Sequence, residues 1–128
     1  MSKHILVIDD DESILEVVQI VLEGEGYRVQ TSLNGDCLQH LELDRPDLIL
    51  LDILLSGEDG RELCSQLKSN PATSTIPVIM LSAHSQAHKT QGADGADAFL
   101  EKPFDIDVLI STVQRYLNTG ETQNMPAR

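Results

Sequence analysis

The chain has 128 residues and a formal net charge of −12, and 41% of its residues are hydrophobic, which is ordinary for a globular domain. Its nine lysines and arginines are scattered, so no basic stripe is available to neutralise nucleic-acid phosphates. No apolar run approaches the roughly 20 residues that span a bilayer, and the amino terminus does not resemble a signal peptide. We therefore expect a cytoplasmic protein that contacts neither nucleic acid nor membrane, with one domain over residues 1–118 and a disordered tail over 119–128.

Short apolar runs that alternate with amphipathic stretches predict five strands and the helices between them. The strands are expected at residues 4–9, 27–32, 48–52, 76–82 and 96–100. The first helix is capped by Asp11 or Ser13 and stopped at residues 24–26. Its apolar face is expected to consist of Ile14, Val17, Val18, Val21 and Leu22. A short helix opens at Asn34-Gly35, a longer one covers residues 59–69, and a last one follows the capping residue Asp105.

Strands that alternate with helices imply βαβ units, and therefore an α/β fold with a doubly wound parallel sheet and right-handed crossovers. Residues 83–95 fit this pattern worst, because a fourth helix should cross there and the stretch contains no Leu, Ile, Val or Phe. With so little apolar surface to bury, that helix is expected to be short or mobile. Cys37 and Cys64 occupy apolar helical positions without CxxC spacing, so we expect reduced core residues rather than a disulfide or a metal site.

Polar side chains follow four of the predicted strands. Asp9-Asp10 follow the first strand, Asp52 ends the central one, Ser82 ends the fourth and Lys102 follows the fifth. The carboxyl ends of parallel strands share one edge of a sheet, so these groups should converge. Two carboxylates 4 Å apart repel by roughly 4 kcal/mol at an effective dielectric of 20, and such a cluster calls for a divalent cation or a raised pKa. Oxygen ligands without His or Cys favour Mg²⁺, or Mn²⁺, and the whole set is suited to phosphoryl transfer.

These residues resemble the receiver domain of two-component response regulators. The resemblance runs from about His4 to Leu117 and rests on Asp9-Asp10, Asp52, Ser82-Ala83 and Lys102-Pro103-Phe104 in that order. The chain as a whole is similar to the single-domain response regulators of the chemotaxis type. The resemblance implies a flavodoxin-like (βα)5 fold with strand order 2-1-3-4-5.

The resemblance also implies a role for each of these positions. Asp52 would be the phosphoacceptor and a metal ligand, Asp10 would bind Mg²⁺ directly, Asp9 would bind it through water, and the backbone carbonyl of Leu54 would complete the set. Lys102 would bind a phosphoryl oxygen, and its bond to the following proline would be cis.

Two further residues belong to the switch that the resemblance implies. Ser82 would hydrogen-bond the attached phosphoryl group, and Phe99 would turn inward on activation.

The resemblance also bears on the lifetime of the phosphorylated state. Leu54 and His84 would line the path of the hydrolytic water. Because a leucine cannot orient a water molecule, we expect a phosphorylated state that lasts minutes or longer.

The loop after Asp52 departs from the family pattern. Ser56 replaces the usual proline and predicts a less rigid loop. Glu58 replaces a hydrophobic residue, and its carboxylate is expected to be solvated, with metal coordination or repulsion of a phosphodonor as alternatives. Ser82 and Lys102 are 20 residues apart, which is shorter than usual in the family and coincides with the weak fourth helix.

The predicted function is a stand-alone response regulator. A sensor histidine kinase or histidine phosphotransfer protein would phosphorylate Asp52, and the altered surface would bind a downstream protein. The chain would then be no enzyme beyond its own phosphorylation and dephosphorylation, and a monomer or weak dimer. One alternative is a pseudo-receiver that binds partners without phosphorylation. A second is a Mg²⁺-dependent aspartyl-phosphate phosphatase, which Leu54 disfavours because such enzymes usually carry an acid at that position.

Overall fold

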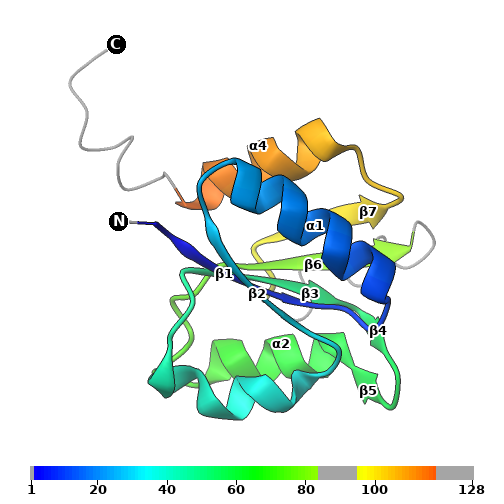
Figure 1. Ribbon diagram of the computed structural model, residues 1–128. Helices are drawn as coiled ribbons and strands as arrows, with labels where there is room; N and C mark the ends of the chain where they lie inside the picture. Colours follow the sequence, from blue (N-terminus) through cyan, green and yellow to red (C-terminus); the bar gives the residue numbers. More distant parts are fainter. Residues whose placement is uncertain (1, 84–94, 118–128) are drawn as a thin grey trace.

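The computed structural model describes residues 2–83 and 95–117, and these form a five-stranded parallel sheet with helices on both faces (Figure 1). The strand order is β2-β1-β3-β6-β7, which confirms the predicted doubly wound topology. The strands are β1 (His4–Ile8), β2 (Arg28–Ser32), β3 (Leu48–Asp52), β6 (Val78–Ala83) and β7 (Ala98–Lys102). A two-stranded antiparallel hairpin of β4 (Leu54–Leu55) and β5 (Glu58–Asp59) follows β3. The predicted fourth helix and the predicted tail lie outside the described residues.

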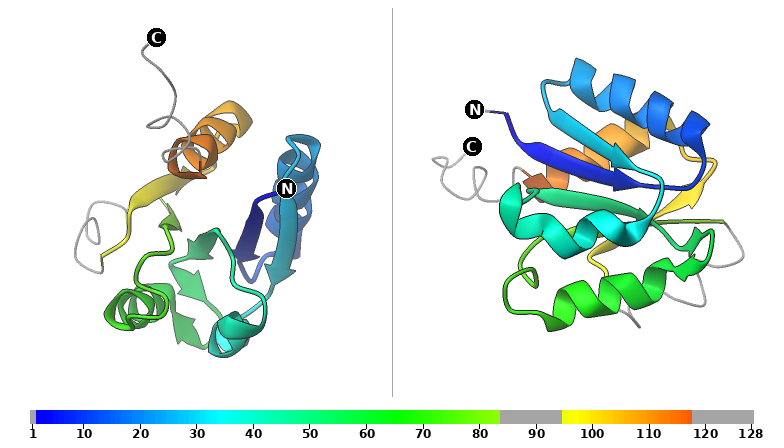
Figure 2. Two further views of the ribbon diagram at one scale, coloured as in Figure 1. Left: turned by 90° about the vertical axis from the view of Figure 1, so that its left-hand side faces the viewer. Right: turned by 60° about the horizontal axis from the view of Figure 1, so that its bottom comes forward.

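The helices form two layers around the sheet. They are α1 (Glu12–Gly24), the 3₁₀-helix η1 (Gly35–Leu43), α2 (Gly60–Ser69) and α4 (Ile106–Leu117). Helices α1 and α4 cover one face, and η1 and α2 cover the other, as the views in Figure 2 show. Among the described residues, no helix is both long enough and apolar enough to span a membrane.

The central strands are apolar at every position because each face of the sheet has its own core. In β3, Leu48 and Leu50 pack under α1 and α4, whereas Ile49 and Leu51 pack under η1 and α2. All four side chains are fully buried. The two-residue period of a strand therefore divides one apolar run between two helical layers, which is typical of parallel sheets.

Aspartates begin three of the helices. Asp11, Asp59 and Asp105 each accept a hydrogen bond, 2.9 Å long, from the backbone N–H two residues later. Such caps satisfy a donor that the first helical turn leaves free. Capping by Asp11 and by Asp105 confirms the sequence prediction.

The structure corrects the predicted apolar face of α1. Val17 is 48% exposed, whereas Leu15 is buried together with Val18 and Leu22. The predicted short helix exists as a 3₁₀-helix with a kink at His40. Neither Cys37 nor Cys64 forms a disulfide; Cys64 is buried and Cys37 partly buried, as predicted.

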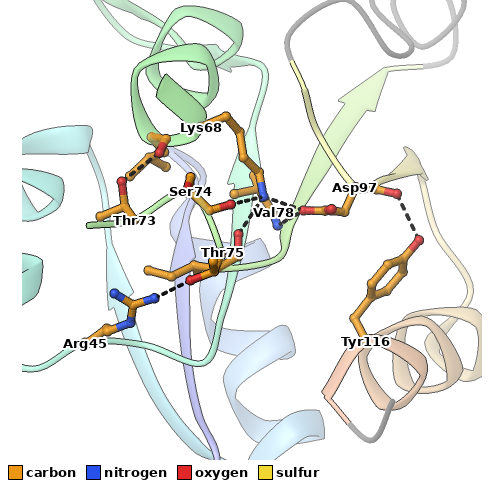
Figure 3. A network of polar contacts seen from close by, with 10 residues as sticks. Arg45, Lys68, Thr73, Ser74, Thr75, Val78, Asp97 and Tyr116 are labelled. Atoms are coloured by element: carbon orange, nitrogen blue, oxygen red, sulfur yellow. Dashed lines mark hydrogen bonds and ion pairs between the residues drawn. The ribbon is translucent and has the colours of Figure 1, made fainter. Parts of the chain in front are cut away.

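A partly buried lysine, Lys68, joins the ends of three elements on the side of the sheet where β6 and β7 begin (Figure 3). Lys68, at the end of α2, donates to the carbonyl of Ile76 at 2.8 Å and forms an ion pair with Asp97 at 2.7 Å. The same carboxylate oxygen of Asp97 accepts from the backbone N–H of Val78 at 2.8 Å. The hydroxyl of Tyr116 on α4 donates to the carbonyl of Asp97 at 2.9 Å. These contacts hold the start of β7 against β6 and α4.

Candidate functional site

The predicted polar residues meet at the carboxyl edge of the sheet. Asp9 directly follows β1, Asp52 ends β3 and Lys102 ends β7, and the hairpin β4–β5 lies at this same end (Figure 1). One carboxylate oxygen from each of Asp9, Asp10 and Asp52 lies within 4.8 Å of the others. Parallel strand pairing produces this convergence, because β1, β3, β6 and β7 are consecutive neighbours in the sheet.

Lys102 connects two of the three carboxylates. Its Nζ lies 2.9 Å from Oδ2 of Asp9 and 3.3 Å from Oδ1 of Asp52. Asp9 is fully buried, and its other oxygen accepts from the backbone N–H of Asp11 at 2.9 Å. The Lys102–Pro103 peptide bond is cis, as the resemblance implied.

Burial and mutual charge shift the acid–base equilibria of the site. Burial, and after it the neighbouring charge of Asp9, raise the pKa of Asp52 from 3.8 to about 6, although Lys102 and the backbone N–H of Leu54 act in the opposite direction. Burial alone would lower the pKa of Lys102, but its contacts with Asp9 and Asp52 outweigh this effect and the pKa is raised. Lys102 is therefore a permanent cation at neutral pH, and Asp52 is a carboxylate that still lacks full charge compensation.

The donor set fits a hard divalent cation. Three carboxylates and one ammonium carry a formal charge of −2, and every available ligand atom at the cluster is an oxygen. Such oxygen sets prefer Mg²⁺ or Mn²⁺ to zinc. The raised pKa of Asp52 follows from the same crowding of carboxylates, whose mutual repulsion a bound cation would relieve.

The hairpin β4–β5 is held by side chains rather than by a proline. Its turn lies at Ser56-Gly57, where the glycine has a φ of 77°. Ser56 Oγ donates to Oδ2 of Asp10 at 2.8 Å. Glu58 Oε1 accepts from the backbone N–H of Gly35 at 2.8 Å. The expectation of a solvated Glu58 is therefore wrong, because its carboxylate caps the start of η1. The hydrogen bond from Ser56 to Asp10 was not predicted from the sequence, where Ser56 was considered only as a replacement for proline.

Gly60 permits a close backbone approach beside Asp52. A Cβ at this position would lie 2.0 Å from the carbonyl oxygen of Asp52 and 2.9 Å from Cα of Ile53. The N–H of Gly60 donates to the carbonyl of Ile53 at 2.7 Å. Gly60 was not among the predicted site residues, although the Asp59-Gly60 pair that opens α2 was the available sequence signal.

Ser82 and Phe99 lie on the two strands that complete this edge of the sheet. Ser82 is fully buried in β6, and its hydroxyl has no hydrogen-bond partner within the described part of the chain. Phe99 in β7 is partly buried against the core under η1 and α2. The side chain of Leu54 is 54% exposed. His84 lies outside the described residues.

Residues 5–114 match the protein family described as response regulator receiver domain. This chain is a member of that family of two-component systems. It is 44% identical over 117 residues to the DNA-binding dual master transcriptional regulator RpaA of Synechocystis sp., a match that covers 89% of this chain and 48% of RpaA. This receiver domain spans about half the length of RpaA and of several other curated relatives.

Solved receiver domains share the fold over nearly the full chain. The chemotaxis response regulator CheY4 of Vibrio cholerae superposes with a TM-score of 0.84 at 30% identity, covering 91% of this chain and all of CheY4. The receiver domain of the sensor histidine kinase PA1611 from Pseudomonas aeruginosa PAO1 superposes with a TM-score of 0.83 at 26% identity, covering 92% of this chain and 99% of that one. The PA1611 structure has a magnesium ion coordinated in its active-site cleft.

Proposed function

We propose that this receiver domain accepts a phosphoryl group on Asp52 in a Mg²⁺-dependent reaction and then signals by binding another protein. The observation that carries the proposal is the meeting of Asp9, Asp10 and Asp52 within 4.8 Å, with Lys102 bonded to two of them. Membership of the response regulator receiver family supports the same proposal. Beyond its own phosphorylation and dephosphorylation, the domain would catalyse no reaction.

Asp52 is suited to act as the nucleophile. With a pKa of about 6, its carboxyl group is about nine-tenths ionised at pH 7. One carboxylate oxygen would attack the phosphorus atom of the donor, the bond from phosphorus to the donor atom would break with its electron pair leaving on the donor, and an acyl phosphate would form.

The neighbouring side chains would hold the metal and balance the charge. Asp9, Asp10 and Asp52, with the backbone carbonyl of Leu54, would bind Mg²⁺, which supplies positive charge to the phosphoryl oxygens. Lys102 would move its hydrogen bonds from the carboxylates to a phosphoryl oxygen.

Two residues would change their contacts when Asp52 is phosphorylated. The buried hydroxyl of Ser82 has no partner among the described residues, so a phosphoryl oxygen is a suitable acceptor for it. Phe99, only partly buried, would turn inward as Ser82 engages the phosphoryl group. These movements would change the β6–β7 side of the domain, where a downstream protein would bind.

An apolar depression next to the site offers a surface for the phosphodonor protein. It is lined by Ser13, Ile14, Val17, Val18, Lys102, Pro103 and Phe104. Lys102 belongs both to this depression and to the carboxylate site, so a donor that reaches Asp52 would cover it. The occupant we propose is a sensor histidine kinase or histidine phosphotransfer protein. We also propose that the domain acts in the cytoplasm and is a monomer or weak dimer.

The decisive experiment is incubation with acetyl phosphate and Mg²⁺, followed by intact-mass spectrometry. We expect wild type to gain the mass of one phosphoryl group, and Asp52→Ala, or wild type without Mg²⁺, to gain none. Asp36→Asn, which changes an exposed carboxylate on η1, serves as the control and should react like wild type. If wild type is neither phosphorylated nor stabilised by beryllofluoride with Mg²⁺, the proposal is wrong and the pseudo-receiver takes its place.

The docking surface has its own test. Val17→Asp should slow phosphotransfer from any phosphorylated histidine kinase that modifies wild type, while leaving the reaction with acetyl phosphate unchanged. Ile20→Asp is the matched control, because Ile20 is 65% exposed on the same helix and does not line the depression. Equal transfer rates for both variants would contradict this placement of the donor.

A further inference from the structure

The hydroxyl of Ser56 reaches across the site to a carboxylate that is 46 residues away in sequence. Ser56 Oγ donates to Oδ2 of Asp10 at 2.8 Å. The resemblance assigns Ser56 only as a substitution for proline, and no role follows for it from that comparison. Its contact with one of the three clustered carboxylates indicates a role in the metal site.

The three carboxylates differ in how they are held. Asp9 is buried and fixed by Lys102 and the N–H of Asp11. Asp52 is buried and fixed by Lys102 and the N–H of Leu54. Asp10 is exposed, and within the described part of the chain Ser56 is the one donor to its carboxylate. Asp10 is therefore the carboxylate whose position depends most on a single contact.

The paired strands β4 and β5 flank the turn that carries Ser56. Leu54 pairs with Asp59, and Leu55 pairs with Glu58, on either side of the turn that carries Ser56. The carboxylate of Glu58 is bonded to the N–H of Gly35 at the start of η1. The turn therefore follows β3 closely at one end and is joined to η1 through Glu58 in its second strand. In this arrangement the hydroxyl of Ser56 faces the Asp10 carboxylate.

We propose that Ser56 is a positioning residue that holds the Asp10 carboxylate toward Asp9 and Asp52 and thereby strengthens Mg²⁺ binding. This inference rests on the proposed function, because it assumes the metal site. The hydroxyl uses one lone pair of Oδ2, and the other lone pairs of the carboxylate remain available to a cation. A carboxylate that is already oriented loses less side-chain freedom when the cation binds.

The expected effect is moderate. Hydrogen bonds to metal ligands commonly change metal affinity by about 10- to 100-fold. Because Ser56 and Asp10 are both exposed, water replaces part of the lost contact. We therefore expect Ser56→Ala to raise the dissociation constant for Mg²⁺ by about 3- to 10-fold.

Isothermal titration with MgCl₂ tests this inference on wild type and three variants. Ser56→Ala should bind Mg²⁺ more weakly, and Ser56→Thr, which keeps the hydroxyl, should bind it nearly as wild type does. Ser65→Ala makes the same change on the exposed side of α2 and should have no effect. Urea unfolding without Mg²⁺ should show similar stability for Ser56→Ala and wild type, which separates the role in metal binding from a role in folding.

The kinetic signature is a shift in the Mg²⁺ requirement alone. At saturating Mg²⁺, Ser56→Ala should react with acetyl phosphate at the wild-type rate, while half the maximal rate should require about 3- to 10-fold more Mg²⁺. Unchanged or tighter Mg²⁺ binding by Ser56→Ala, or a Ser56→Thr variant as weak as Ser56→Ala, would overturn the inference and leave the proposed function intact. Failure of wild type itself to bind Mg²⁺ would overturn both.

Discussion

Replacing Asp52, the proposed phosphoacceptor, should make the protein more stable. In the folded state the pKa of Asp52 is about 6, against 3.8 for an ordinary aspartate. The folded chain therefore binds a proton at Asp52 over a pH range in which the unfolded chain has released it. Linkage then requires stability to fall as pH rises from about 4 to about 6, and the whole penalty persists above that range.

The penalty can be estimated from the difference in pKa. About two pKa units correspond to about 3 kcal/mol, which is applicable here because the Asp52 side chain is only 8% exposed. The attraction between Asp52 and Lys102 is already contained in this net shift. The buried amide of Asp52→Asn leaves an N–H group beside the Lys102 cation without an acceptor, which offsets about 1 kcal/mol. Lys102 keeps its bond to Asp9. We expect the free energy of unfolding of Asp52→Asn to exceed that of wild type by about 2 kcal/mol at pH 7.5 without Mg²⁺, which corresponds to a Tm higher by about 7 °C.

Urea unfolding of wild type and Asp52→Asn, at pH 4.5 and 7.5 with EDTA, measures this gain. The advantage of the variant should be largest at pH 7.5 and should shrink toward zero at pH 4.5. Addition of 10 mM Mg²⁺, roughly a saturating amount for such sites, should stabilise wild type and narrow the difference. Asp36→Asn should change stability by less than about 0.5 kcal/mol. A variant that is no more stable than wild type at pH 7.5 would refute the reasoning.

Three further predictions concern single side chains. Gly60→Ala should destabilise the fold by about 3 kcal/mol or more in urea unfolding, because its Cβ would overlap the carbonyl of Asp52, whereas Gly24→Ala, with nothing within 4 Å, should be neutral or stabilising. Lys68→Met should cost about 1–2 kcal/mol, because the carbonyl of Ile76 loses its donor while water partly replaces the cation at the exposed Asp97 carboxylate. A loss below 0.5 kcal/mol, roughly that of an exposed lysine, would contradict this. Leu54→Asn should shorten the lifetime of the phosphorylated state, measured by loss of the phosphoryl mass with time, since an amide can orient a water; a wild-type half-life of seconds would contradict the expectation of a long-lived state.

The fold class and the location of the site could be predicted because they depend on local patterns. A strand such as β3 that is apolar at every position needs cover on both faces, which requires helices on both sides of the sheet. Parallel strands place their carboxyl ends on one edge, so Asp9, Asp52 and Lys102 could be brought together without coordinates. Helix caps such as Asp11 and Asp105 are equally local, since the donor lies two residues away.

Tertiary packing decided what these patterns left open. In α1, Val17 and Leu15 both fit a helical spacing, and only the docking of the helix on β1 and β2 buried Leu15 and exposed Val17. The bonds of Ser56 to Asp10 and of Glu58 to Gly35 join residues 46 and 23 positions apart. The Lys68–Asp97 pair in Figure 3 spans 29 positions. Periodicity fixes only which side of an element a residue occupies, whereas the partner of a polar side chain depends on which other elements the whole chain packs against it.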